Sequence, residues 1–251
     1  MMMRWLLIFL LLPCLAQAEE VVLGLSRDRV AITTSFDGSD ILIFGAVKRE
    51  APIAEEPLGV VITVAGPSAP VLVRRKSREF GIWVNTDAVE VDLAPSFYVV
   101  ASTGPIRDVL SNVEDLRHKI SIDRAIRSVG APDTIRDSRN FTNALIRIRR
   151  NDDLYQESEG KVVLAEQTLF RTSVKLPANL VEGDYTIRTF LTREGRVVSK
   201  HETTIDVRKV GLERWLYTLA QEQAMLYGLM SLAIAALAGW LASAAFVMLR
   251  R

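Results

Sequence analysis

The stretch Met225–Leu249, MLYGLMSLAIAALAGWLASAAFVML, carries no charged side chain and is followed directly by Arg250 and Arg251. At about 1.5 Å of rise per residue, a helix of this length extends about 37 Å. A hydrocarbon core about 30 Å thick needs only about 20 apolar residues. A helix that packs against the core of a soluble protein normally keeps one polar face, which this stretch lacks. We therefore expect residues 225–249 to form a transmembrane helix.

The amino-terminal residues 1–18 have the pattern of a cleavable secretory signal. Arg4 precedes an apolar run, and the small-residue pattern Ala16-Gln17-Ala18 follows it. Cleavage after this pattern would make Glu19 the first residue of the mature chain. A translocated amino terminus with one later span leaves residues 250–251 in the cytoplasm, as the positive-inside rule prefers. We expect a single-pass protein of the bacterial inner membrane whose amino-terminal domain is periplasmic.

The composition excludes several kinds of chemistry from the exported part. The one cysteine, Cys14, lies in the predicted signal, so disulfides, thiol catalysis and cysteine-bound metals are not expected. Because Pro13 rather than a small residue precedes Cys14, a lipoprotein is the less favoured alternative. The 30 acidic residues and all but three of the 31 basic residues lie in the exported part. That part is nearly neutral, and we expect no nucleic-acid partner.

Short apolar segments separated by Pro and Gly follow the signal and predict strands. The predicted strands cover residues 21–25, 29–35, 41–47, 58–64, 71–75, 80–85, 88–93 and 97–101. Asp37-Gly38 is a tight-turn signal, so the second and third of these strands are predicted to pair as a hairpin. The spacing predicts a mainly β domain of the immunoglobulin-like β-sandwich kind. Trp83 is most simply a core aromatic of this sandwich, and stacking on a ligand is the less favoured alternative.

The pattern changes to a helical one at Pro105. Apolar residues at three- and four-residue steps predict an amphipathic helix over 106–119, with a second helical phase from Ile122 to Val129. A further helix is predicted over Ser138–Arg150. Its apolar face would consist of Phe141, Leu145 and Ile148. We expect these helices to form an inserted layer, at about 105–150, that lies against the sandwich.

Strands return after Gly160. Apolar residues alternate over 170–176, and residues 185–192 and 197–207 flank Arg193-Glu194-Gly195-Arg196 as a predicted hairpin. We favour one composite exported domain, residues 19–209, over two separate lobes.

Residues 210–224 predict a helical stalk between the exported domain and the span. Apolar residues of this segment share one helical face, and we expect one continuous helix from about Leu212 into the membrane. Aromatic side chains concentrate where the membrane interface would lie. The predicted interfacial anchors are Trp215, Tyr217 and Tyr227.

The span also carries a row of small residues at four-residue intervals. The row consists of Ser231, Ala235, Gly239 and Ser243. Small side chains on one face allow another helix to approach closely. The row predicts association with a membrane protein or with a second copy of the chain, although an alanine-rich span also produces such rows by chance.

Residues suited to catalysis or metal binding are few. His118 and His201 do not have a metal-ligand spacing, and no hydrolase or phosphate-binding motif occurs. The carboxylate pairs Glu55-Glu56, Asp152-Asp153 and Asp37 with Asp40 lie in predicted loops. A glycosidase-like pair remains the less favoured alternative, and the short Asp37 turn supplies too few oxygens for calcium. We expect no catalytic, cofactor-binding or metal-binding residues.

A basic run from Arg74 to Arg78 allows two interpretations. Such a run can dock anionic lipid headgroups if it faces the bilayer. More often, Lys and Arg on a strand edge prevent unwanted pairing. We favour the second interpretation.

Several segments together resemble a known family. They are Leu23-Gly24-Leu25-Ser26, Phe36-Asp37-Gly38-Ser39-Asp40, Phe44-Gly45-Ala46, Gly81-Ile82-Trp83-Val84-Asn85 and Gly183-Asp184-Tyr185. With a signal peptide and one carboxy-terminal span, they resemble an alphaproteobacterial family of single-span transmembrane proteins of about this length. The likeness covers nearly the whole chain. It implies no catalytic residues, and at most a role associated with a transporter.

Three functions fit these observations. The first is a non-enzymatic binding or accessory module for a multispanning membrane protein, anchored in the lipid bilayer. The second is an anchored periplasmic enzyme that uses carboxylates on envelope material, and the third is a self-associating structural envelope protein. The scarcity of reactive side chains favours the first, without a cofactor.

Overall fold

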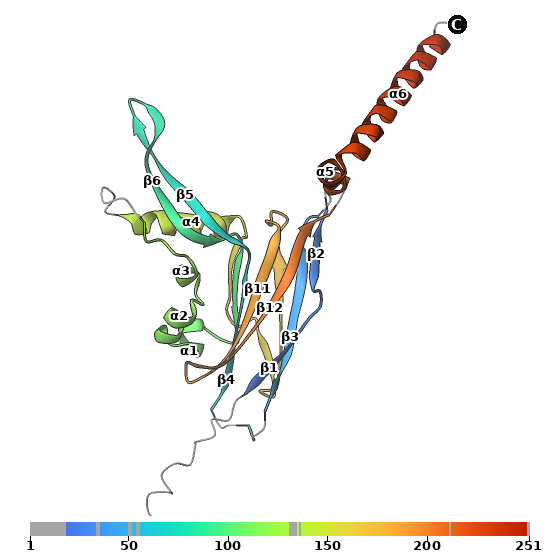
Figure 1. The fold of residues 1–251 in the computed structure, drawn as a ribbon. Coiled ribbons are helices and arrows are strands. Elements are labelled where there is room, and N and C mark those ends of the chain that lie inside the picture. The colour runs from blue at the N-terminus through green and yellow to red at the C-terminus, as the bar shows by residue number, and fades with distance from the viewer. Residues whose placement is uncertain are drawn as a thin grey trace, which may run out of the picture.

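The computed structural model describes residues 19–33, 36–49, 52–53, 56–130, 135, 137–210 and 212–249. The predicted signal at residues 1–18, Cys14 within it, and the predicted cytoplasmic residues Arg250 and Arg251 lie outside the described residues. The described chain is mainly β, as the sequence predicts, and ends in one long apolar helix (Figure 1).

Two sheets and one projecting hairpin make up the β structure. The four-stranded sheet has the order β1 (Glu20–Leu25), β3 (Ser39–Lys48), β10 (Leu169–Leu176) and β9 (Val163–Ala165). The six-stranded sheet has the order β2 (Arg29–Ile32), β12 (Arg196–Lys209), β11 (Gly183–Arg193), β4 (Leu58–Ala65), β7 (Tyr98–Ser102) and β8 (Tyr155–Ser158). The hairpin consists of β5 (Ser68–Glu79) and β6 (Ile82–Pro95).

Both sheets contribute to one hydrophobic core. Alternate residues of β10 are buried, as the predicted strand over 170–176 requires, whereas β4 is buried on both faces. Ile43 of the four-stranded sheet and Ile62 and Ile187 of the six-stranded sheet belong to the same buried cluster. The two sheets are therefore stabilised by burying their apolar faces together.

Strands from before and after the helical segment share both sheets. β10 pairs with β3, with Thr172 opposite Ile43, and β11 pairs with β4, with Thr189 opposite Ile62. The β-rich part is thus a single composite structure. The predicted β11–β12 hairpin is confirmed, with its turn at Glu194-Gly195.

The hairpin predicted for residues 29–35 and 41–47 is wrong. β2 runs parallel to β12, whereas β3 pairs with β1 and β10. Gly38 has φ of 117°, and it lies in the connection that leads from β2 in one sheet to β3 in the other. Val30 and Ile41 consequently enter the same core from opposite sheets.

Four helices lie beside β4, β7, β8 and the base of the β5–β6 hairpin (Figure 1). They are α1 (Ile106–Val109), α2 (Asn112–His118), α3 (Ile122–Ala125) and α4 (Ser138–Asn151). The range predicted for α4 is confirmed, with Phe141 and Leu145 buried. Ile146 rather than the predicted Ile148 completes its buried face.

The single helix predicted over 106–119 is wrong. Leu110 has an extended backbone with φ of −139° and ψ of 129°, and its side chain is buried in the core. The next residue, Ser111, donates its backbone N–H to the Gly195 carbonyl at 2.8 Å, and its hydroxyl accepts from the N–H of Glu114. The first helix therefore ends before Leu110. Ser111 contacts the β11–β12 turn and is the N-cap of a second helix.

The β5–β6 hairpin corrects two further predictions. Segments 80–85 and 88–93 belong to one long strand, and the turn lies at Phe80-Gly81. Trp83 is not a core residue, since 68% of it is exposed. Only the base of the hairpin, including Val89 and Val91, reaches the core.

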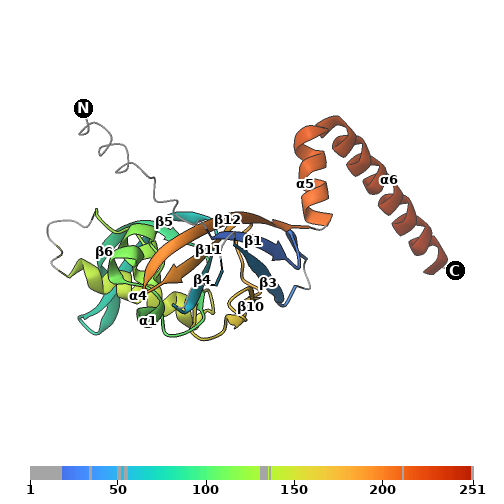
Figure 2. The same ribbon diagram turned by 90° about the horizontal axis from the view of Figure 1, so that it is seen from below.

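Two helices follow the β structure and project away from it (Figures 1 and 2). They are α5 (Leu212–Glu222) and α6 (Ala224–Leu249). The prediction of one continuous helix is wrong, because the chain bends at Gln223, within the polar run Gln221–Gln223 (Figure 2). Backbone bonds still connect the helices across the bend, from Gln223 N–H to Leu219 and from Tyr227 N–H to Gln223.

Candidate membrane-facing site

The helix α6 coincides with the predicted span. Its window Ala224–Ser243 has a mean hydropathy of 1.8, and none of it is buried against the described parts of the chain. An apolar helix of this length that no described part of the protein covers is long enough to cross a bilayer. Its length and composition make lipid or another helix its natural surroundings.

The predicted row of small residues lies exposed along α6. The Ser231 hydroxyl donates to the Tyr227 carbonyl at 2.9 Å, so its polar group is satisfied within the helix. A Cβ atom added at Gly239 would meet no atom within 4 Å. A larger side chain there therefore fits the isolated chain, and its effect would be felt only by a partner.

Two of the three predicted aromatic anchors have described side chains. Tyr217 on α5 is exposed, and Tyr227 near the start of α6 is also exposed. The side chain of Trp215 lies outside the described residues. The bend at Gln223 lies between Tyr217 and Tyr227.

Sequence reasoning missed an apolar surface at the tip of the β5–β6 hairpin. Phe80 is fully exposed, and 64% of Ile82 is exposed beside the exposed Trp83. The available sequence signal for a turn here was Gly81, which lies between Phe80 and Ile82 and shortly after the charged pair Arg78-Glu79. We call Phe80, Ile82 and Trp83 the hairpin tip.

Basic residues follow directly behind the hairpin tip. Arg75 lies about midway along the hairpin, where it forms ion pairs with Asp87 at 2.7 Å and with Asp137, and its guanidinium lies over the Phe141 ring. These contacts fasten the hairpin to α4. Arg74, Lys76 and Arg78 form no ion pair with any residue that the structure describes, and Arg78 lies directly opposite Trp83.

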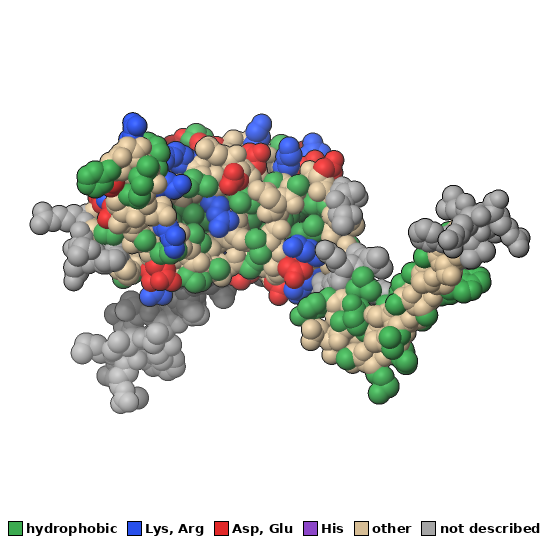
Figure 3. Space-filling view, turned by 90° about the horizontal axis from the view of Figure 1, so that it is seen from above, with side chains coloured by type: hydrophobic (Ala, Val, Ile, Leu, Met, Phe, Trp, Pro, Cys, Tyr) green, Lys and Arg blue, Asp and Glu red, His purple; other side chains and the backbone are tan. Residues whose placement is uncertain are grey.

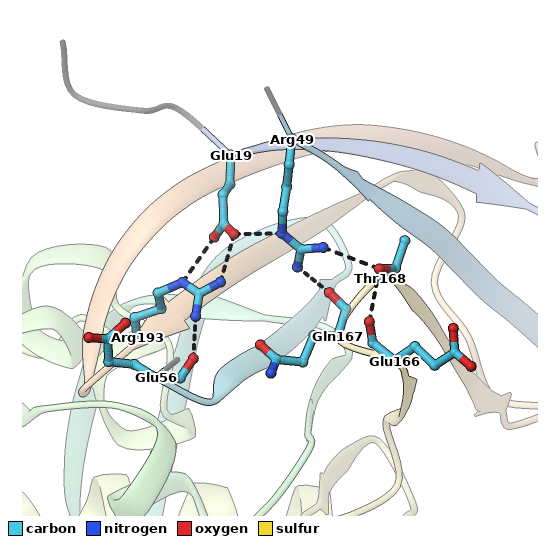
Figure 4. Close-up of polar contacts among 7 residues, drawn as sticks. All are labelled: Glu19, Arg49, Glu56, Glu166, Gln167, Thr168 and Arg193. Carbon is cyan, nitrogen blue, oxygen red and sulfur yellow. Dashed lines mark hydrogen bonds and ion pairs between the residues drawn. The ribbon is translucent and has the colours of Figure 1, made fainter. Parts of the chain in front are cut away.

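A second polar cluster lies at the other end of the sheets, around Glu19 (Figure 4). The Glu19 carboxylate accepts from Arg49 Nε at 2.8 Å and from Arg193 Nη2 at 2.7 Å. Arg49 also donates to the Gln167 carbonyl and to Thr168, and Arg193 donates to the Glu56 carbonyl. The cluster joins the start of β1 and the end of β3 to the end of β11, so it ties one sheet to the other.

The Glu19 carboxylate remains ionised in these surroundings. Burial would raise its pKa, but hydrogen bonds and charges from Arg193 and Arg49 outweigh burial and lower the pKa below the ordinary value of 4.5. Both basic partners are nearly buried, with 10% of the Arg49 side chain and 13% of the Arg193 side chain exposed. Both guanidinium groups therefore share the Glu19 carboxylate as their ion-pair partner, and we interpret the cluster as structural.

We predict that Glu19→Gln lowers the free energy of unfolding by about 2 to 3 kcal/mol at pH 7, because two nearly buried guanidinium groups lose their counterion. The neighbouring Glu20→Gln is the matched control, since Glu20 forms only an exposed pair with Lys48. Urea unfolding measures both. Because the folded pKa of Glu19 is lowered, its stabilisation is complete above the ordinary pKa and is lost as pH falls through the folded value. The difference between wild type and Glu19→Gln should shrink below about pH 4.5, and a pH-independent difference would contradict this account.

The predicted candidates for chemistry are dispersed. His118 contacts Glu114 at 3.3 Å and packs against Phe190. His201 is on β12 and lies opposite Thr189 of β11. Within the described ranges, no group of three or more His, Cys, Asp or Glu is placed to hold a metal ion. Asp153 hydrogen-bonds through its backbone carbonyl to Gln156, and Glu55 lies outside the described residues.

The chain matches the model of a protein family over most of its length. The model of the family described as "Putative transmembrane protein (Alph_Pro_TM)" matches residues 20–248. The match runs from the first residue of β1 to within one residue of the end of α6. No curated protein matches the chain.

Proposed function

Because the chain belongs to the Alph_Pro_TM family of transmembrane proteins, we propose that it is a single-pass module of the bacterial inner membrane. The β-rich domain lies in the periplasm, and the carboxy terminus lies in the cytoplasm. The module is not an enzyme. It binds, as an accessory, a multispanning membrane protein such as a transporter.

One observation carries this proposal. The helix α6 is apolar on all sides and uncovered, whereas the β-rich domain has a complete core of its own. The helix therefore contributes to location and association rather than to the fold. The scarcity of clustered reactive side chains supports binding over catalysis, and the small-residue row provides a surface for a partner helix.

The test is to purify the full-length chain from its native membrane in mild detergent, through a carboxy-terminal tag, and to identify co-purifying proteins by mass spectrometry. We expect a multispanning protein in near-equal amount. Recovery of the chain alone would contradict the accessory role.

We predict that Ala235→Leu combined with Gly239→Leu abolishes this association, because the added side chains separate the two helices. The control is Ala233→Leu, which adds the same bulk as Ala235→Leu alone but about 200° around the helix from Ser231; Ala235→Leu is therefore also measured singly. Co-purified protein is quantified by mass spectrometry for each variant. Unchanged association in the double variant, or equal loss in the control, would exclude this face as the contact.

A further inference from the structure

The hairpin tip is energetically unfavourable in water. Three large apolar side chains, those of Phe80, Ile82 and Trp83, are exposed within four residues at the turn, and a concentration of exposed apolar surface marks interaction sites. The outer half of the hairpin is exposed along both strands, with Ser77 and Val84 only partly buried. A two-stranded hairpin without a covering layer is only marginally stable by itself. No described part of the chain shields this tip.

The backbone at Phe80 adds a second cost. Phe80 has φ of 51° and Gly81 has φ of 86°, so both central residues of the turn have positive φ. Asn or Gly is preferred at the first of these positions, and a bulky aromatic residue there is disfavoured. Phe80 thus makes the turn less stable, and its side chain is not buried by any described part of the chain. This cost indicates that the side chain contacts something outside the chain.

The β5–β6 hairpin and the helices α5 and α6 project from the same end of the sheets. β4 and β12 are both antiparallel to β11, so they run in the same direction. The hairpin follows β4, and the helices α5 and α6 follow β12. Figure 1 shows both projecting from that end of the sheets.

The hairpin is long enough to reach the bilayer. β5 has 12 residues, which span about 40 Å at about 3.3 Å per residue. β12 continues five residues beyond Thr204, which lies level with Ala65 at the end of β4, and α5 adds 11 residues. Together these segments span at most about 33 Å. The tip can therefore reach the level at which α6 enters the membrane. The view from this end shows apolar side chains with Lys and Arg around them over the hairpin (Figure 3).

The charges of the hairpin fit a lipid surface. Arg74, Lys76 and Arg78 lie behind the tip, and Glu79 is the one acidic residue between residues 74 and 85. Anionic headgroups attract basic residues close to a membrane. Tryptophan favours the interface, where its apolar ring and polar N–H are both accommodated. Protection of a strand edge would explain the basic residues, but it would not explain the exposed apolar tip.

We propose that the hairpin tip is a second membrane contact, inserted into the headgroup region of the bilayer that α6 enters. Phe80, Ile82 and Trp83 enter the interface, and Lys76 and Arg78 contact anionic phosphates. This proposal rests on α6 spanning the same bilayer. Two contacts at separate points would fix the orientation of the β-rich domain on the membrane, which a single bent stalk cannot do.

The test places a fluorescent label at the tip of the full-length protein. Ile82→Cys, in a Cys14→Ser background, is labelled with an environment-sensitive dye and reconstituted into vesicles of phosphatidylcholine and phosphatidylglycerol. The matched control is a label at Glu194→Cys, in the turn at the opposite end of β11 and β12. We expect headgroup-attached nitroxide lipids to quench the Ile82 label, and aqueous iodide to quench it severalfold less than the Glu194 label.

A second variant distinguishes loss of membrane contact at the hairpin tip from loss of folding. Phe80→Asn creates the Asn-Gly pair that a turn of this kind prefers, so the melting temperature should stay unchanged or rise. Protection of the Ile82 label from iodide should nevertheless be lost. Lys76→Ser with Arg78→Ser should reduce protection most in vesicles that contain phosphatidylglycerol.

Equal quenching of the Ile82 and Glu194 labels would overturn the proposal, provided that alkaline carbonate leaves the protein in the vesicles. Such retention shows that α6 still anchors the chain, so failure of the tip is distinct from failure of the anchor. Protection that appears only in native membranes, and not in pure lipid vesicles, would also overturn it, in favour of a protein partner.

Discussion

Ending the chain after Val210 is expected to convert a protein that leaves the membrane only in detergent into a water-soluble domain with its fold intact. The core residues identified in the described chain lie between Val21 and Val207. Removing α5 and α6 thus removes the membrane-spanning apolar surface while leaving that core whole. Val210 is kept because its N–H donates to the Ile32 carbonyl at 2.9 Å.

A three-member series tests this expectation. The full chain should resist alkaline carbonate, a chain ending after Gln223 should be stripped by it, and the chain ending after Val210 should appear in the soluble fraction. Circular dichroism and urea unfolding check that the shortest chain retains a cooperative β-rich fold. Carbonate-resistant membrane binding of the shortest chain would contradict the assignment of α6 as the anchor. Loss of cooperative unfolding would show that the helices also stabilise the domain.

Sequence patterns predicted the elements whose environment is uniform along their length. In β10, one face meets the core at every second residue, and the alternation of Phe170, Thr172, Val174 and Leu176 follows directly. The span likewise has one environment throughout. Its apolar composition was therefore sufficient to locate α6 to within one residue.

Tertiary contacts decided the elements that the patterns misplaced. Asp37-Gly38 lies in a connection between two strands, as predicted, but local sequence cannot tell whether those strands are neighbours in one sheet or belong to two sheets. Apolar residues do recur with a helical period from Ile106 to Lys119. Burial of the Leu110 side chain in the core nevertheless stabilises the fold more than a continued helix would, and Leu110 has an extended backbone. Val113 and Leu116 remain exposed as a result.

The candidate site was only half predictable for a related reason. An apolar run of 25 residues is readily predicted to span a membrane. A single tryptophan in a predicted strand, such as Trp83, is normally predicted to lie in a core. Its exposure depends on β5 and β6 extending beyond the body of the protein. The direction of that extension is fixed by contacts midway along the hairpin, where Arg75 binds Asp87 and Asp137, and no short-range sequence pattern predicts them.

We expect Arg188→Met to weaken the attachment of the helical segment to the six-stranded sheet and to lower the free energy of unfolding by about 2 to 4 kcal/mol. The Arg188 guanidinium on β11 donates to the His118 carbonyl at 2.8 Å, the Lys119 carbonyl at 3.1 Å and the Tyr98 hydroxyl at 3.0 Å. The two carbonyls end α2, where a cation also interacts favourably with the helix dipole. Methionine keeps much of the packing volume and removes these bonds.

The matched control is Arg208→Met, on the neighbouring strand β12. Arg208 pairs with Asp184 and Asp206 at the surface, and surface ion pairs contribute about 0 to 1 kcal/mol. Urea unfolding compares the two variants in one detergent. Limited trypsin digestion supplies an independent readout, because Arg124 and Arg127 are exposed and a loosened backbone lets trypsin cleave after them faster. Equal unfolding midpoints for the two variants, with unchanged digestion, would mean that the core contacts of Leu110 and Ile120 hold the helices without Arg188.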